Sequence, residues 1–174
     1  MTKPELLDII NSWENLPIVI REIANNPDYY EMLMDIALYH PSEKSWRAAY
    51  MIDKINDEFP ELILPYIDKI ILQLKEEKRS SKKRHFLKLL SQNLILEKNF
   101  GFLVEYCLET LKSAKEPPAV RVHAMQILYN ISEKEFDLKP EILLVIEHEM
   151  EFHSTAGILS RGRKLAKKLR QQIL

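Results

Sequence analysis

The sequence predicts an all-α protein, folded as a right-handed α-α superhelix of stacked helix pairs, and two observations support this. One apolar helix pattern recurs, and its central residue pairs lie 38, 38 and 41 residues apart, a period typical of helical repeat proteins. These pairs are Ala48/Ala49, Phe86/Leu87, Ala124/Met125 and Leu165/Ala166. In addition, the chain of 174 residues has only three glycines, whereas β-hairpins need glycine where a turn requires positive φ.

The first 26 residues are predicted to form a short, degenerate helix pair that caps the stack. Thr2 and Glu5 have the spacing of a capping box, in which each side chain satisfies a backbone N–H of the other residue. The helix that they begin is expected to end near Trp13. A second short helix is expected after Pro17, because proline is favoured in the first turn of a helix.

Beyond this cap, the pattern alternates between two kinds of helix, which we name A and B. A helices are expected at 27–39, 61–76, 99–114 and 139–152. Each is followed, after a short polar break, by a B helix, at 42–57, 79–93, 117–132 and 156–173. Pro65 should kink or delay the second A helix, because proline lacks the N–H of a helical bond. No long linker divides the chain, so one domain over 1–174 is predicted, with helix pairs at 27–58, 59–94, 95–133 and 134–174.

The composition limits the possible partners and compartments. The formal net charge is −1, so no overall field attracts the chain to nucleic acid or a membrane. Cys107 is the single cysteine, which excludes an internal disulfide and favours a reducing compartment. The sequence shows neither the apolar region of a signal peptide nor a run long enough to span a membrane. A cytoplasmic protein is expected.

The B helices share one apolar face, which is expected to pack against the A helices and the neighbouring repeats. When the first residue of each copy (Lys44, Lys82, Val120 and Arg161) is numbered zero, most apolar residues fall at offsets 4, 5, 8 and 11. They are Ala48, Ala49, Ile52, Ile55, Phe86, Leu87, Leu90, Ala124, Met125, Leu128, Ile131, Leu165, Ala166 and Leu169.

Two of the B helices and one proline resemble HEAT repeats. The second-helix pattern of that family is matched by Arg47-Ala48-Ala49 followed by Ile52 and Ile55, and by Val120-Arg121 followed by Ala124, Leu128 and Ile131. A proline early in an A helix, as in Leu64-Pro65-Tyr66, is also typical. The resemblance implies an armadillo-type α-solenoid in which the B helices line the concave surface.

Over nearly its whole length the chain also resembles a group of short bacterial HEAT-like proteins of unknown function. The matching stretches run from Trp46-Arg-Ala-Ala through Leu64-Pro-Tyr-Ile and from Ala119-Val-Arg to Ala166-Lys-Lys-Leu. Some members of this group carry the name adenylosuccinate lyase. The true lyases are several times longer and hold their catalytic serine in a glycine- and serine-rich mobile loop, which this chain lacks. We therefore reject that name.

Polar residues occupy the opposite side of the B helices, at offsets 3, 6 and 10, and we call these twelve positions the B-helix stripe. The stripe holds five lysines or arginines, two histidines and no carboxylate, although acids slightly outnumber bases in the chain. Its members are Arg47, Tyr50, Lys54, His85, Lys88, Gln92, His123, Gln126, Asn130, Lys164, Lys167 and Gln171. Acidic residues gather instead on the A helices.

Two functions are compatible with the stripe. The first is a non-catalytic scaffold or adaptor that binds a protein partner or an acidic peptide through its B helices, without enzymatic activity, cofactor or metal. The alternative is a nucleic-acid-binding protein, with a possible relation to HEAT-like DNA alkylpurine glycosylases, which combine a basic concave face with aromatic residues and an aspartate. Trp46, Tyr50 and Asp53 would be the corresponding residues. A plain solvated helix face also accounts for the composition of the stripe.

The remaining candidates for chemistry are weak. His148 and His153 are five residues apart, which would place them about 140° apart on a helix, whereas a zincin motif needs a spacing of four. His85 and His123 share one repeat offset and are expected to be exposed polar residues. Cys107 lies within an apolar A helix and is expected in the core rather than as a nucleophile.

Overall fold

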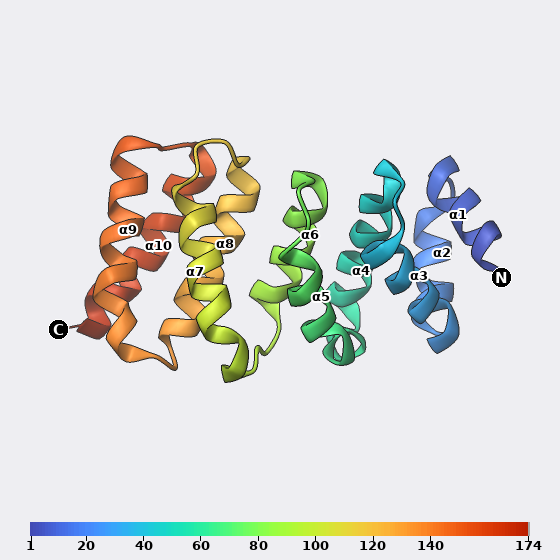
Figure 1. Cartoon of the computed structure of the whole chain (residues 1–174), viewed down its shortest axis with the longest axis horizontal. Helices are drawn as coiled ribbons and strands as arrows, with labels where there is room; N and C mark the ends of the chain where they lie inside the picture. Colours follow the sequence, from blue (N-terminus) through green and yellow to red (C-terminus); the bar gives the residue numbers. More distant parts are fainter. Residues whose placement is uncertain (174) are drawn as a thin grey trace. The chain divides into compact units, whose positions relative to one another are not determined.

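The computed structural model describes residues 1–173 and confirms the all-α prediction. These residues contain ten α-helices and four 3₁₀ helices, and they include no strand (Figure 1). They form two compact units, the first from Met1 to Leu89 and the second from Leu90 onward. The boundary falls within helix α6 (Ser80–Gln92). The right-handed superhelix and the single domain stay predictions, and each unit is described by itself below.

The first unit begins with the predicted pair of short helices, α1 (Lys3–Ser12) and α2 (Leu16–Ala24). The capping box is present: the Glu5 backbone N–H donates to the Thr2 hydroxyl at 3.4 Å, and the Thr2 backbone N–H donates to the Glu5 carboxylate at 2.6 Å. Helix α1 ends at Trp13, as predicted, because this residue adopts a left-handed conformation with φ 62°.

The next pair consists of α3 (Pro27–Tyr39) and α4 (Trp46–Glu58), which pack against each other. The Asn26 side chain starts α3 by accepting hydrogen bonds from the backbone N–H groups of Asp28 and Tyr29. The B helix was expected from residue 42. Its first turn is instead the 3₁₀ helix η1 (Glu43–Ser45), and α-helical geometry begins at Trp46.

Pro65 has the predicted effect on the following A helix. Residues Pro60–Tyr66 form a 3₁₀ helix, η2, and the α-helix α5 extends only over Ile67–Leu74. Proline offers no N–H to the carbonyl four residues earlier, so regular α-helix starts after it. Helix α6 follows as the B helix of this pair.

The second unit contains four longer helices, α7 (Phe100–Lys112), α8 (Pro118–Ser132), α9 (Lys139–Phe152) and α10 (Ala156–Ile173). The short 3₁₀ turns η3 (Glu97–Asn99) and η4 (Phe136–Leu138) precede α7 and α9. Helix α8 packs against α7 and α10, and α9 packs against α10 (Figure 1). Cys107 is fully buried in α7, as expected, and burial raises the pKa of its thiol.

The predicted apolar face of the B helices lies in the core of both units. All fourteen residues at offsets 4, 5, 8 and 11 that were assigned to it are buried. Burial of such side chains stabilises the fold by about 25 cal/mol for each Å² of apolar surface removed from water. Among the described residues, no helix is both long and apolar enough to cross a membrane.

A buried ionic cluster lies at the connection between α5 and α6. Glu77 accepts from the Arg79 side chain at 2.8 Å and from the Lys82 ammonium at 3.2 Å. Lys82 is fully buried, and Arg79 also donates to the Ser42 carbonyl of the preceding repeat at 3.1 Å. Burial alone would raise the pKa of Glu77, but the hydrogen bonds from Arg79 and the charge of Lys82 outweigh it and lower the pKa to about 2.

This depressed pKa predicts a specific acid dependence of stability. Glu77 stabilises the fold fully above its unfolded-state pKa of 4.5, and the contribution is lost as the pH falls from there towards 2. Replacing Glu77 by Gln should lower the free energy of unfolding by about 3 kcal/mol at pH 7, because the fully buried Lys82 and the half-buried Arg79 lose their partner. Urea denaturation at several pH values should show this difference shrinking below pH 4.5. The exposed neighbour Glu76→Gln is the control, and a difference independent of pH would contradict the role of the carboxylate.

The cap of α3 gives a second prediction. Asn26→Ala should lower the free energy of unfolding by about 1 kcal/mol, because two N–H groups of the first helical turn lose their acceptor. Asn26→Asp, which keeps an acceptor oxygen at the same place, should retain most of the stability. Chemical denaturation of the three proteins measures both effects, and equal losses in the two variants would contradict the capping role.

Candidate functional site

Arg47, the first member of the B-helix stripe, is committed to contacts within the first unit. Its guanidinium donates to the carbonyl oxygens of Ile10 and Asn11 at 3.1 and 3.0 Å, and it lies 4.9 Å from the centre of the Trp13 ring. The last carbonyls of a helix lack partners within that helix. Arg47 therefore ties α4 to the end of α1 and acts as a structural residue.

Asp53 is not a member of the stripe, but it pairs with stripe residues and offsets their positive charge. His85 Nδ1 lies 3.1 Å from one carboxylate oxygen of Asp53, and Lys88 Nζ lies 2.6 Å from the other. Lys88 is also 3.6 Å from Asp57, as is Lys54. The two carboxylates thus neutralise Lys54 and Lys88, two of the basic members of the stripe in this unit.

His85 is buried, so the expectation that it is an exposed polar residue is wrong. It is 6% exposed because its ring stacks on Trp46 and meets the edge of Tyr50 while its nitrogen faces Asp53. Burial would raise the pKa of Asp53, but the hydrogen bonds from His85 and Lys88 outweigh it and hold the pKa below its usual range. Asp53 is therefore an ionised structural residue.

Trp46, Tyr50 and Asp53, the residues that would correspond to those of the glycosylases, lie together in the structure. Trp13 adds another ring to the group, 6.0 Å from Trp46 and 5.4 Å from Tyr50 between ring centres. The Asp53 side chain, however, is only 5% exposed, and both of its oxygens are engaged. The arrangement is that of a packed cluster with an internal counter-ion.

On α8 the stripe residues also face partners in their own unit. The Gln126 amide donates to the Asn130 side chain and accepts from Arg161, at 2.8 and 2.6 Å. The Asn130 amide donates to the Ser91 carbonyl at 2.8 Å. His123 is half-buried rather than exposed as expected.

The stripe residues of α10 are different, because Lys164, Lys167 and Gln171 are all exposed. Arg163 is exposed on the same side of this helix, since residues three and four apart lie on one face. Within the described part of the chain, no hydrogen bond or ion pair joins Arg163, Lys164 or Lys167 to another side chain. The remaining stripe residue, Gln92, is exposed as well, at the end of α6.

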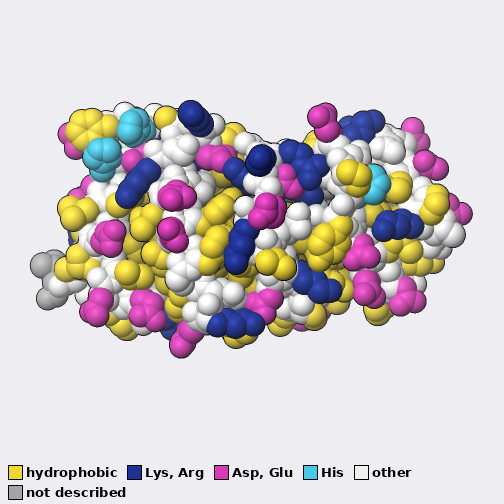
Figure 2. Space-filling model, viewed as in Figure 1, with side chains coloured by type: hydrophobic (Ala, Val, Ile, Leu, Met, Phe, Trp, Pro, Cys, Tyr) yellow, Lys and Arg dark blue, Asp and Glu magenta, His cyan; other side chains and the backbone are white. Residues whose placement is uncertain are grey.

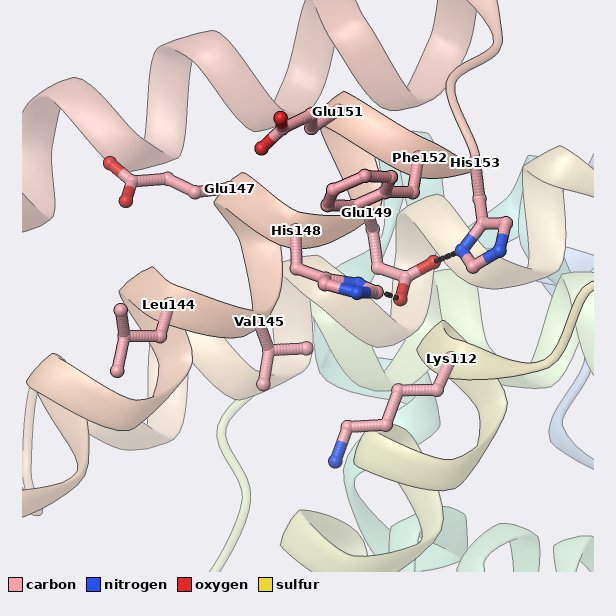
Figure 3. Close-up of a pocket in the computed structure, with 9 residues that line it drawn as sticks. All are labelled: Lys112, Leu144, Val145, Glu147, His148, Glu149, Glu151, Phe152 and His153. Atoms are coloured by element: carbon pink, nitrogen blue, oxygen red, sulfur yellow. Dashed lines mark hydrogen bonds and ion pairs between the residues drawn. The ribbon is translucent and has the colours of Figure 1, made fainter.

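A second group of polar residues gathers at the end of α9, around a hollow of about 650 Å³ (Figure 3). His148 Nδ1 lies 3.1 Å from one oxygen of Glu149, and His153 Nδ1 lies 2.9 Å from the other. The two rings flank the carboxylate in Figure 3. Lys112 and the apolar side chains of Leu144, Val145 and Phe152 also line this hollow, together with the carboxylates of Glu147 and Glu151.

His148 and His153 meet one carboxylate although they are five residues apart, because Glu149 lies between them in the sequence. His148 is its neighbour, and His153, the residue that caps the end of α9, follows it by four residues. Residues four apart lie on one face of a helix, so the buried Glu149 can contact both rings. The spacing of a glutamate with a histidine four residues later could have indicated this.

Arg121 binds Glu149 from the interior of the second unit. Its guanidinium donates to the Glu149 carboxylate at 2.6 Å and to the Leu111 carbonyl at 2.8 Å. Both side chains of this ion pair are at most 5% exposed. On the surface, histidine side chains lie beside hydrophobic side chains at the end of α9 (Figure 2). The carboxylate is therefore buried while the two rings reach solvent.

These contacts predict that two lysines of the stripe respond differently to charge reversal. Lys88→Glu should lower the free energy of unfolding by about 2 kcal/mol or more, because it places a third carboxylate beside Asp53 and Asp57. Lys167→Glu lies on an exposed helix face and should change it by less than about 0.5 kcal/mol. Urea denaturation compares them, and equal stability of the two variants would contradict the structural role of Lys88.

Comparison with protein families gives one match over most of the chain. The model of the HEAT repeat domain matches residues 5–169, which include α4, α6 and α8 in full and most of α10. Searches of curated proteins and of solved structures gave no match. The helix pairs, their period and this match agree, and the chain belongs to the HEAT repeat family.

Proposed function

We propose that this protein is a non-catalytic scaffold that binds an acidic segment of a protein partner through the exposed face of α10. HEAT repeats commonly act as protein-interaction scaffolds, and membership of this family supports such a role. The observation that carries the finer proposal is the group formed by Arg163, Lys164 and Lys167, which we call the α10 basic face.

The α10 basic face, which joins the stripe residues Lys164 and Lys167 with the neighbouring Arg163, has charge that is available to a partner. The basic stripe residues of the first unit have partners already, since Lys54 and Lys88 pair with aspartates and Arg47 binds the end of α1. Three further cations of α10 have contacts of their own, since Arg161 donates to Gln126, Lys168 lies over the Tyr129 ring and Arg170 pairs with Glu147. The three remaining cations of α10 are exposed and form no ion pair within the described part of the chain, so their charge faces solvent.

The size of the basic face favours a peptide over a nucleic acid. Proteins that bind duplex DNA commonly neutralise about 6–10 phosphates, and each contact adds to the salt dependence of binding. Three side chains on one helix supply fewer contacts than that. They match a short run of aspartates or glutamates, with Gln171 on the same face as a hydrogen-bonding group.

A capture experiment with matched variants tests the proposal. The triple reversal Arg163→Glu, Lys164→Glu and Lys167→Glu should remove at least about nine-tenths of the captured partner from an extract of the native cells, because the face becomes repulsive. Mass spectrometry identifies the protein, and a parallel assay scores nucleic acid in the same eluates. Circular dichroism and thermal unfolding should show that the variant keeps its fold.

The control reverses a base elsewhere in the same unit. Lys115 is exposed on the connection between α7 and α8, and Lys115→Glu should leave capture unchanged. Equal recovery with the triple variant would contradict the proposed face. Recovery of nucleic acid with a steep loss at higher salt would favour the nucleic-acid alternative instead.

A further inference from the structure

We propose that His148, Glu149 and His153 form a binding site for a transition-metal dication of the Zn²⁺ class at the end of α9. The proposal is independent of the α10 basic face, because it rests on other residues and another kind of ligand. The potential ligand atoms of the three residues all lie within 4.8 Å of one another. We call this group the α9 triad.

The distances within the triad suit a metal of this size. Zinc lies about 2.0–2.2 Å from nitrogen and oxygen ligands, so two ligands of a tetrahedral site are about 3.4 Å apart. The two Nδ1 atoms are 3.1 and 2.9 Å from the carboxylate oxygens. Small rotations of the two rings would open these hydrogen bonds into metal bonds.

The rings are free to make that adjustment, whereas the carboxylate is held. The His148 and His153 side chains are 56% and 42% exposed, while the Glu149 side chain is 2% exposed. Arg121 fixes Glu149 from behind at 2.6 Å. A fixed oxygen ligand between two adjustable nitrogen ligands gives a site that can close around an ion.

Protonation of the histidines is compatible with this change. Each neutral ring can carry its proton on Nδ1, where it donates to Glu149, or on Nε2, which leaves the Nδ1 lone pair for the metal. Binding therefore requires only a change of tautomer in a neutral ring.

The donor set selects the class of metal. Two imidazole nitrogens and one carboxylate suit zinc, cobalt, nickel or copper, whereas magnesium and calcium prefer oxygen ligands alone. Three protein ligands leave at least one coordination position, and the triad lines a hollow of about 650 Å³. The open position would therefore face solvent, where a water molecule or a donor atom from a partner can bind.

The charges around the triad limit its affinity. Arg121 already neutralises Glu149, and Lys112 lines the same hollow. Glu147 and Glu151 also line it and supply opposite charge, although Glu147 pairs with Arg170. We therefore expect affinity for Zn²⁺ of roughly micromolar order rather than that of a closed structural site.

Metal titrations of the whole protein test the site. The wild type should bind one equivalent of Zn²⁺ in calorimetry, and Co²⁺ in its place should give the visible absorption of a low-symmetry site with nitrogen ligands. His148→Ala and His153→Ala should each weaken Zn²⁺ binding at least about tenfold, since even loss of an outer-shell partner of a ligand costs that much. Both histidines are exposed, so both variants should fold.

The matched control is Glu151→Gln, which removes an exposed carboxylate from the same hollow but not from the triad. Its Zn²⁺ affinity should stay within about threefold of the wild type. The proposal is overturned by absence of uptake in the wild type, by unchanged uptake in the histidine variants, or by an equal loss in Glu151→Gln. Displacement of Zn²⁺ by millimolar Mg²⁺ would also overturn it, because that result indicates diffuse attraction to carboxylates.

Discussion

The buried ion pair between Arg121 and Glu149 holds the second unit together at the point where two of its helices end. Arg121 comes from α8, but it donates to the Leu111 carbonyl near the end of α7 and to the His153 carbonyl just beyond α9. These carbonyls lack helical partners, so one guanidinium satisfies two helix ends and a carboxylate. Removal of either charge would leave the other buried and unpaired.

The same ion pair determines what the surface above it can do. A carboxylate that is fixed and almost completely buried can orient two exposed imidazole rings without losing its own position. The polar group at the end of α9 is therefore an extension of the core of the unit. In the first unit, Asp53 stands between His85 and Lys88 in a comparable way, but there the histidine is itself buried and stacked on Trp46, whereas His148 and His153 are exposed.

Much of the fold could be predicted because it depends on patterns that are local in the sequence. The apolar offsets of the B helices, the capping box at Thr2 and the delay at Pro65 each follow from residues within a few turns of one another. The charged pairs could not be predicted in this way. Asp53 meets His85 across 32 residues, and Arg121 meets Glu149 across 28.

The stripe illustrates the limit of an argument from repeat offsets. Positions that are equivalent in the sequence do not keep the same environment, since Arg47 binds helix carbonyls, His85 is buried and Lys164 is exposed. A repeat fixes which side of a helix faces the core, because the core is shared by all copies. The contacts of the outer side depend on the residues beside it, and these residues differ from one copy to the next.

The solitary thiol of Cys107 gives the molecule an internal reporter. Because it lies at 0% exposure in α7 and burial raises its pKa, a labelling reagent can reach it only when the surrounding helices separate. The rate of labelling under native conditions therefore measures how often the second unit opens. No other cysteine competes for the reagent, so the natural sequence serves this purpose without substitution.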